Sequence, residues 1–296
     1  MLQQARKPLL LDLLRYLCLA ALLCFSENAS ASVHKIGPDL YAYISDNDSS
    51  SNSTFLVGDH GILVVDTGLN AEEGRKLLAE IRRLTSAPVR WIVNTHYHRD
   101  HRGGNGVLGP NAEIISTGYT REKVVHDGAR QYAGNVAVQG ELRLYVGSHT
   151  VRMYDPGPAH TRGDLVVYFP DQRAIATGDL FLTNSCPAMD DGDMENWIAA
   201  LDQILALPIE HVVPGHFELA TTNELRRFHD YLSALREQVS RMYRNGVSLE
   251  QVRTRISLPA FKDLRQYPKY EATFADNAEA YYGQLQQRDG KPPRAR

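Results

Sequence analysis

Residues Thr95–His101 read T-H-Y-H-R-D-H, and they follow directly on the apolar run Val89–Val93. The run predicts a buried strand, so the polar residues after it lie at a strand end. Four of them carry imidazole or carboxylate groups, which are donors that proteins use for zinc: His96, His98, Asp100 and His101. A lone histidine in a polar loop is ordinarily a surface residue, whereas a cluster of this density indicates a metal site.

The spacing within the cluster indicates a turn rather than a regular helix. Side chains that meet on one helix face are three or four positions apart. Here His96 and His98 are two apart, and Asp100 and His101 are adjacent. The pair Gly103-Gly104 follows, and glycine lets the backbone bend tightly. We therefore expect a turn wrapped around metal after the strand.

On both sides of the cluster, short apolar runs predict strands and apolar residues at helical spacing predict helices. Before it, strands are expected over Leu40–Ser45, Thr54–Gly58 and Ile62–Val65, and a helix capped by Asn70 over Ala71–Leu84. After it, strands are expected over Leu165–Phe169, Ala174–Ala176 and His211–Val213, with a helix capped by Asp193 before the last of these. Further helices are expected over Glu224–Arg244, after a cap at Ser248, and over Asp276–Gln287.

The two halves of this pattern are alike. Each reads strand, aspartate-bearing turn, helix, strand and histidine-bearing turn, with Asp66 and His96 in the first half. Asp179 and His216 take these places in the second half, at strand ends where ligand-binding residues of α/β folds lie. His160 lies in a loop that is rich in glycine and proline. The other histidines lack such a setting and are expected at the surface or with satisfied polar atoms: His34, His60, His126, His149, His211 and His229.

The bulk composition is that of an ordinary globular protein. The 296 residues are 43% hydrophobic and 23% charged, with a net charge of −3. No basic stripe is present, so nucleic acid is not an expected partner. The sequence does not determine the oligomeric state. No Gly-, Ser- or Pro-rich linker divides the chain, and only the polar tail 289–296 is expected to be disordered.

The N-terminus predicts a cleaved signal peptide. Arg6 and Lys7 precede the apolar run Tyr16–Phe25, which is too short to span a bilayer, and Ala29–Ala31 gives a small-residue cleavage signature. We therefore expect residues 1–31 to be removed and residues 32–296 to form one periplasmic or secreted domain without stable membrane insertion. Because Asp12 and Arg15 interrupt the apolar stretch, an uncleaved amphipathic anchor is the alternative. The remaining cysteine, Cys186, is expected to be a buried apolar side chain.

Taken in order, five motifs resemble those of the metallo-β-lactamase-fold hydrolase superfamily. They are Asp66 in V-V-D-T-G, the H-x-H-x-D-H cluster, His160 in A-H-T-x-G-D, Asp179 in T-G-D and His216 in P-G-H. The resemblance implies an α/β fold of four layers, an αββα sandwich, with the site at one edge of its two sheets. It also implies two zinc ions. His96, His98 and His160 would bind the first, Asp100, His101 and His216 the second, and Asp179 both.

The chemistry implied is hydrolysis by a metal-activated hydroxide, since zinc lowers the pKa of its water to about 7. Asp100 would be the catalytic residue that holds this nucleophile, and Asp66 would orient ligands without binding metal. No serine or cysteine nucleophile is then required, so Ser185 and Cys186 need no catalytic role.

The resemblance implies a small-molecule substrate, whose class it leaves open among lactams, lactones, thioesters and other esters. The best-known β-lactamases of the superfamily carry Cys or Ser at the position of Asp179, and many carry Lys where Leu182 stands. A cation that binds a substrate carboxylate would have to be Arg162 or a residue of the presumed loop region Thr120–Glu141. The alternative to a hydrolase is a non-hydrolytic metalloprotein on this fold, either an iron-dependent oxidoreductase or an accessory protein of a periplasmic system.

Overall fold

Seven strands form the first sheet, in the spatial order β1-β2-β3-β4-β5-β6-β7. They are β1 (Ser32–Lys35), β2 (Leu40–Ile44), β3 (Ser53–Gly58), β4 (Gly61–Val65), β5 (Val89–Val93), β6 (Glu113–Thr117) and β7 (Val136–Val138). The strands from β1 to β4 pair antiparallel, and those from β4 to β7 pair parallel. The parallel part needs crossover connections, which are helical: α2 (Ala71–Leu84), α3 (Arg99–Arg102), α4 (Asn105–Leu108) and α5 (Gly118–His126).

Five strands form the second sheet, in the order β13-β11-β10-β9-β8. They are β8 (Glu141–Val146), β9 (His149–Tyr154), β10 (Val166–Phe169), β11 (Ala174–Gly178) and β13 (His211–Pro214). Helix α6 (Met194–Leu205) joins β11 to its parallel neighbour β13. The chain continues in α7 (Thr222–Arg244), α8 (Leu249–Arg255) and α9 (Phe274–Arg288), and the short strands β12 (Ser185–Cys186) and β14 (Arg265–Gln266) pair in parallel.

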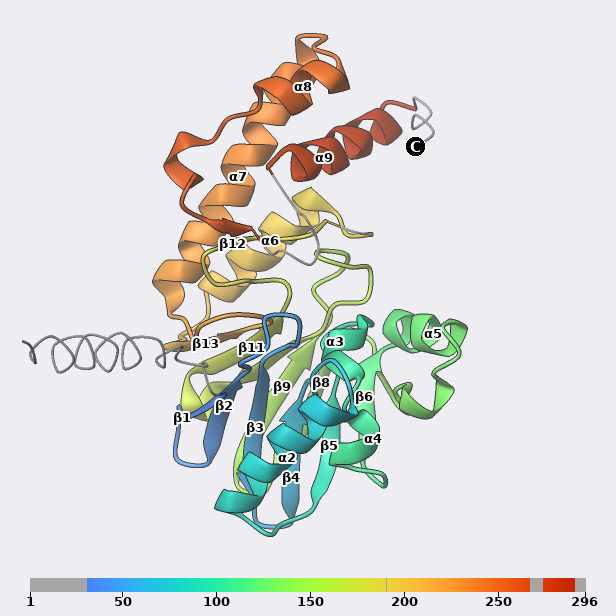
Figure 1. The fold of residues 1–296 in the computed structure, drawn as a ribbon, viewed down its shortest axis with the longest axis vertical. Helices are drawn as coiled ribbons and strands as arrows, with labels where there is room; N and C mark the ends of the chain where they lie inside the picture. Colours follow the sequence, from blue (N-terminus) through green and yellow to red (C-terminus); the bar gives the residue numbers. More distant parts are fainter. Residues whose placement is uncertain (1–30, 190, 267–273, 291–296) are drawn as a thin grey trace, which may run out of the picture. The chain divides into compact units, whose positions relative to one another are not determined.

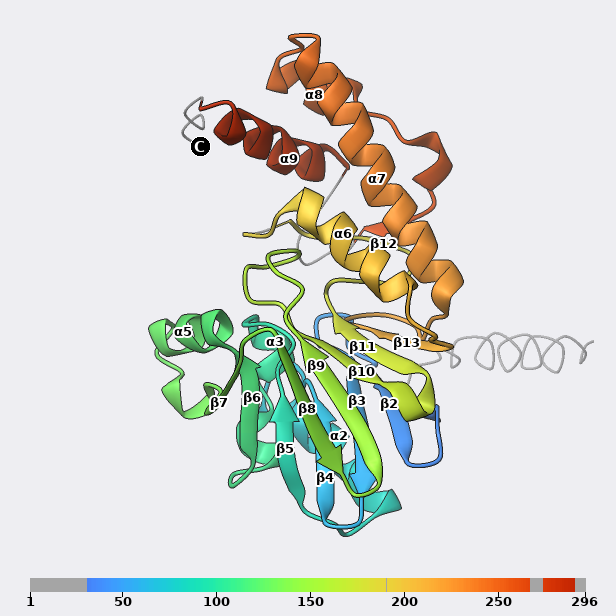
Figure 2. The ribbon, with the colours of Figure 1, turned by 180° about the vertical axis from the view of Figure 1, so that it is seen from behind.

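Alternation of side chains along the strands produces the layers. Leu63 and Val65 of β4 point into the core between the sheets, whereas Val64 points outward against α2. In β10, Val167 faces the core between the sheets and Tyr168 faces the core that includes α6 and α7. Helices therefore cover both outer faces, as Figures 1 and 2 show from opposite sides. The expected αββα sandwich is confirmed.

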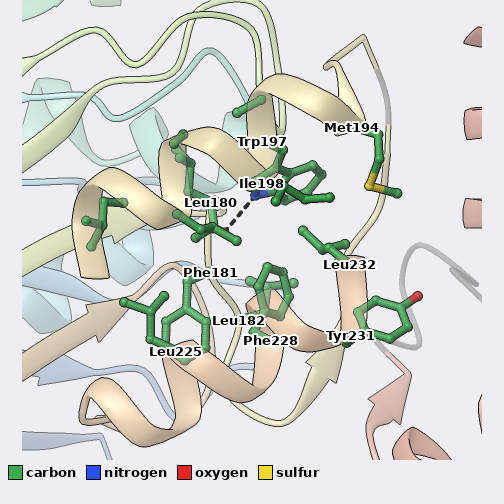
Figure 3. Packing of buried hydrophobic residues seen from close by; sticks show 14 of the residues in the cluster. Leu180, Phe181, Leu182, Met194, Trp197, Ile198, Leu225, Phe228, Tyr231 and Leu232 are labelled. Atoms are coloured by element: carbon green, nitrogen blue, oxygen red, sulfur yellow. Dashed lines mark hydrogen bonds between the residues drawn. The ribbon is translucent and has the colours of Figure 1, made fainter. Parts of the chain in front are cut away.

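The core on the outer face of the second sheet is built from large side chains of α6 and α7. Trp197 is fully buried, and its indole nitrogen donates to the carbonyl of Leu180, 2.9 Å away (Figure 3). Phe228 of α7 stacks edge-on against Phe181 at 5.5 Å between ring centroids. Leu180 and Phe181 follow Asp179 directly, so this packing fixes the segment that holds Asp179.

The computed structural model describes residues 31–189, 191–266 and 274–290, which belong to a unit that begins at Ala31. The predicted signal peptide lies outside these residues except for Ala31, and its cleavage and export stay predictions. Of the predicted disordered tail, Asp289 and Gly290 form a turn after α9, and the rest lies outside the described residues. Within the described part of the chain, no helix has the length and apolar content needed to span a membrane.

Most predicted elements are confirmed, including helix Ala71–Leu84 with Asn70 as its cap. The interpretation of Thr120–Glu141 as a loop region was wrong, because this stretch includes most of α5 and the strand β7. Helix α5 buries only Thr120 and Val124, so its apolar pattern in the sequence is weak. The strands β6, β8 and β9 were likewise not predicted.

Candidate metal centre

Parallel strands from both sheets bring the predicted site residues together. Asp66 follows β4, and His96 lies three residues after the end of β5. In the second sheet Asp179 directly follows β11, and His216 lies two residues after β13. Because the carboxyl ends of parallel strands meet at one edge of a sheet, these four residues share an edge of the sandwich. The aspartate-bearing and histidine-bearing turns noted in each half thus lie at the same edge.

The cluster itself combines a turn with a short helix. His96 lies in the turn after β5 and His98 precedes α3, whereas Asp100 and His101 belong to that helix. The expectation that Gly103 and Gly104 are needed for a tight backbone bend was wrong, because both have ordinary helical backbone angles. A Cβ atom on Gly103 would lie 2.0 Å from the carbonyl oxygen of Leu69, and one on Gly104 would lie 2.2 Å from that of Thr67. Glycine is needed there for close packing on the turn after β4.

The first group of donor atoms comes from three histidines and one aspartate. His98 Nδ1 lies 2.9 Å from His96 Nε2 and 3.3 Å from His160 Nε2. Asp179 Oδ2 lies 3.6 Å from His160 Nε2 and 4.0 Å from His96 Nε2. The four ligand atoms lie within 4.8 Å of one another, so they can surround a single ion.

The second group lies beside the first and shares Asp179 with it. Asp100 Oδ2 lies 3.2 Å from His216 Nε2 and 3.7 Å from His101 Nε2. The other oxygen of Asp179, Oδ1, lies 3.2 Å from His101 Nε2 and 3.5 Å from His216 Nε2. Asp179 thus presents one carboxylate oxygen to each group of histidines.

The spacing of these donors fits tetrahedral zinc. Bonds of about 2.1 Å in a tetrahedron place the ligand atoms about 3.4 Å apart, and most of the distances above are close to this value. His101 Nε2 and Asp179 Oδ1 are buried 3.2 Å from each other, and neither has a hydrogen bond to any other described residue. Buried polar atoms ordinarily have partners, and a metal ion would provide one here. The site therefore fits a metal cofactor.

Other residues orient the ligands from behind. Asp66 Oδ2 lies 2.7 Å from His101 Nδ1, and it also accepts from the hydroxyl of Thr95 at 2.7 Å. The backbone N–H of Thr95 donates to Asp66 Oδ1. On the other side, His160 Nδ1 lies 3.1 Å from the carbonyl oxygen of Ala188. Asp66 takes the supporting position expected for it, because its contact leaves His101 Nε2 facing the donors.

The charges of the centre suit a cation. For Asp100 and Asp179, burial opposes ionisation, but the neighbouring His101 and His216 outweigh it and hold both pKa values below the ordinary range. Burial and the adjacent histidines hold the pKa of His96 well below its usual value. The pKa of His101 is instead raised: burial opposes the rise, but Asp179 and the other nearby carboxylates outweigh it. Metal is bound by ionised carboxylates and neutral imidazoles, so a metal ion at His101 would take the place of the proton that the surrounding carboxylates stabilise.

Two of the histidines set aside in the sequence pair with carboxylates outside the centre. His149 contacts Asp39 at 3.0 Å, and His229 contacts Asp202 at 3.0 Å. Cys186 is buried, and burial raises the pKa of its thiol to about 11, so it is a poor nucleophile. Leu182 is buried and Arg162 is exposed.

Sequence reasoning missed three residues beside the centre, namely Tyr97, Tyr119 and Asp191. The Tyr97 ring stands edge-on to the imidazole of His98, with 4.7 Å between centroids. Both tyrosine hydroxyls donate to Asp191, at 3.3 Å from Tyr97 and 2.6 Å from Tyr119. The place of Tyr97 inside the H-x-H motif was the one signal available, since Tyr119 and Asp191 are distant in sequence.

Comparison with known proteins identifies the family. The model of the metallo-beta-lactamase superfamily matches residues 46–216, which contain every residue of the centre described above. The chain belongs to the metallo-beta-lactamase superfamily. Members of this superfamily are mostly hydrolases, which agrees with a metal-dependent enzyme.

Three relatives show how wide the superfamily is. A linear primary-alkylsulfatase of Pseudomonas sp. is 22% identical over 67% of this chain and 48% of its own length. A hydroxyacylglutathione hydrolase of Methylococcus capsulatus is 32% identical over 51% of this chain and 57% of its own. The structure of a stereoselective inverting sec-alkylsulfatase from Pseudomonas sp. matches with a TM-score of 0.72 and 17% identity, over 87% of this chain and 50% of that one. This chain thus spans about half the length of the alkylsulfatases that it resembles.

Proposed function

We propose that the chain is a zinc-dependent hydrolase that cleaves a lactam, lactone, thioester or other ester bond in a small molecule. One observation supports this most directly. Five histidines and two aspartates converge in two adjoining groups, and Asp179 gives one carboxylate oxygen to each. When bound, a pair of zinc ions supplies Lewis acidity and a water with a pKa near 7.

The side chains of the centre then have distinct tasks. His96, His98 and His160 would hold the first ion, Asp100, His101 and His216 would hold the second, and Asp179 would contribute one carboxylate oxygen to each. We assign Asp100 the catalytic role of orienting the attacking water. His98 is partly exposed, whereas the other six side chains are buried. Substrate therefore reaches the centre from the side of His98 and Tyr97.

The relatives support hydrolysis and leave the bond open. They include an alkylsulfatase and a hydroxyacylglutathione hydrolase, so the fold serves more than one kind of substrate. Asp179 at the shared position favours esters and thioesters over β-lactams, since the best-known lactamases of the superfamily have Cys or Ser there.

A metal assay combined with a substrate panel tests this proposal. The purified protein should contain zinc and should hydrolyse at least one of a chromogenic cephalosporin, a lactone and a thioester. Replacing His96 or His98 with Ala should remove most metal from the first position and lower turnover about 100-fold or more, because a three-histidine set loses a ligand. His149→Ala, which alters a histidine away from the centre, is the matched control. Bound iron together with no hydrolysis would contradict the proposal and favour the non-hydrolytic alternative.

A further inference from the structure

Two tyrosines form a wall that leads outward from the exposed side of the centre. The rings of Tyr97 and Tyr119 meet edge-on, with 6.2 Å between their centroids. Tyr97 also contacts the ring of His98, the partly exposed ligand. Both hydroxyls are held by Asp191, which fixes the wall in place. A substrate that approaches from this side passes the two rings.

Two cations lie on this wall. Lys123 Nζ is 5.5 Å from the ring centroid of Tyr97 and 5.6 Å from that of Tyr119, and Arg162 Cζ is 5.7 Å from Tyr119. Cation–π contacts of this length hold a guanidinium without using its N–H donors. Among residues 31–189, 191–266 and 274–290, no ion pair or hydrogen bond is formed by the side chain of either cation. Both therefore keep donors for a ligand.

The acidic residues nearby leave room for an anion. Asp191 accepts from both tyrosines, and Asp193 caps α6 and pairs with Arg288 at 2.9 Å. Glu122 is exposed, so solvent screens its charge. The guanidinium of Arg162 is thus not neutralised by a direct contact with any described carboxylate.

Arg162 also borders a cavity of about 440 Å³ next to the loop of His160. Residues that line it include Pro158, Arg162, Asp191, Gln284, Gln287 and Arg288. A single residue separates His160 from Arg162, so their Cα atoms lie within about 7 Å of each other. The guanidinium also follows the contacts Arg162–Tyr119, Tyr119–Tyr97 and Tyr97–His98, so we expect a molecule whose reacting bond lies at the centre to reach it along the two rings.

We propose that Arg162, placed on Tyr119 beside the metal centre, binds an anionic group of the substrate. The planar guanidinium presents paired N–H donors that match a carboxylate or a sulfate-like group. The substrate class is thus an ester or thioester that carries a second, negatively charged group outside the bond that is cleaved. This inference rests on the proposed hydrolase function and names the class of substrate for that same site.

Kinetics with matched substrates test the proposal. Three thioesters of equal length would carry a terminal carboxylate, sulfonate or neutral carboxamide, and kcat/KM would be measured for each. In Arg162→Gln the ratio of kcat/KM for the charged over the neutral thioester should fall about 10- to 100-fold, since a charge-assisted hydrogen bond is lost. In Arg162→Lys the ratio should fall by less, because lysine keeps the positive charge but lacks the paired N–H donors of the guanidinium. The sulfonate arm shows whether carboxylate or sulfate-like geometry is preferred.

A control variant and a binding assay distinguish failure of the Arg162 assignment from failure of the hydrolase proposal. Arg75→Gln, an exposed arginine on α2, should leave the ratio unchanged. An unchanged ratio in Arg162→Gln would overturn the assignment of Arg162 while the hydrolase proposal stands. If the wild-type protein hydrolyses no thioester, calorimetric titration with succinate decides: weaker binding by Arg162→Gln supports the anion site, and equal or absent binding in both proteins overturns it.

Discussion

Asp66 has a left-handed backbone conformation, with φ of 55°, directly after strand β4. Residues other than glycine seldom adopt this conformation, although Asp and Asn tolerate it better than most. The conformation accompanies a carboxylate that contacts both His101 and Thr95. Backbone strain at such a position is typical of a functional site, and here it coincides with the support of a candidate ligand.

Asp66→Asn tests that support, because Asn keeps the backbone conformation and removes the charge. We expect zinc affinity to fall about 10- to 100-fold, since the amide no longer holds the His101 imidazole as the carboxylate does. Competition with a chromophoric chelator measures the change. Asp39→Asn removes a similar carboxylate contact, to His149, away from the centre, and should have no effect. Equal affinities in the wild type and Asp66→Asn would refute the supporting role.

At the scale of elements, helix α9 supports the segment that carries His160. The side chain of Gln284 accepts from the N–H of Met194 at 3.1 Å and donates to the carbonyl of Gly192 at 3.1 Å. The N–H of Asp193 in turn donates to the carbonyl of Ala159, next to His160. Gly192 packs so closely on Ala159 that a Cβ atom would lie 1.7 Å from its oxygen. A helix beyond the family-matched region thus positions a candidate ligand.

Gln284→Ala should loosen this segment and weaken metal binding at the first position about 2- to 10-fold, as expected for loss of neutral hydrogen bonds. Stepwise zinc titration should show one of two sites weakened, a change that a general loss of stability would not produce. Gln286→Ala on the same helix is the matched control, as its side chain has no hydrogen bond to the described residues. Two sites weakened equally would mean that α9 has no specific link to His160.

At the scale of the whole molecule, the centre joins both sheets. His96 follows a strand of the first sheet, whereas Asp179 and His216 follow strands of the second. Metal bound between them stabilises the folded state, because His160, Asp179 and His216 come near the cluster His96–His101 only when the chain is folded. The region between the sheets is otherwise held by apolar side chains such as Leu63, Val167 and Phe169.

Removal of metal should therefore lower the melting temperature. A ligand present at 100 to 1,000 times its Kd stabilises by about 3 to 4 kcal/mol, which corresponds to about 5 to 15 °C for a chain of this size. Calorimetry before and after dialysis against a chelator, followed by addition of zinc, measures the shift. A variant with both His96→Ala and His216→Ala should show little shift. A chelator-insensitive melting temperature in the wild type would contradict metal binding across the sheets.

The sequence by itself determined the donor residues and most of the elements around them. Periodicity and turn residues are local signals, so strands such as Ile62–Val65 and the helix after Asn70 could be predicted. Motif order then indicated the family, and the structure brings all seven proposed ligands together. Local signals were too weak for α5, which buries few side chains.

Only the tertiary structure showed how distant segments meet. It placed the two oxygens of Asp179 toward different histidine groups, and it brought Tyr119, Asp191 and Gln284 to the surroundings of the centre. These contacts join residues far apart along the chain, and they depend on how the sheets and helices pack. The spacing of residues along the sequence does not reveal such contacts. It does identify ligands that lie on a single turn.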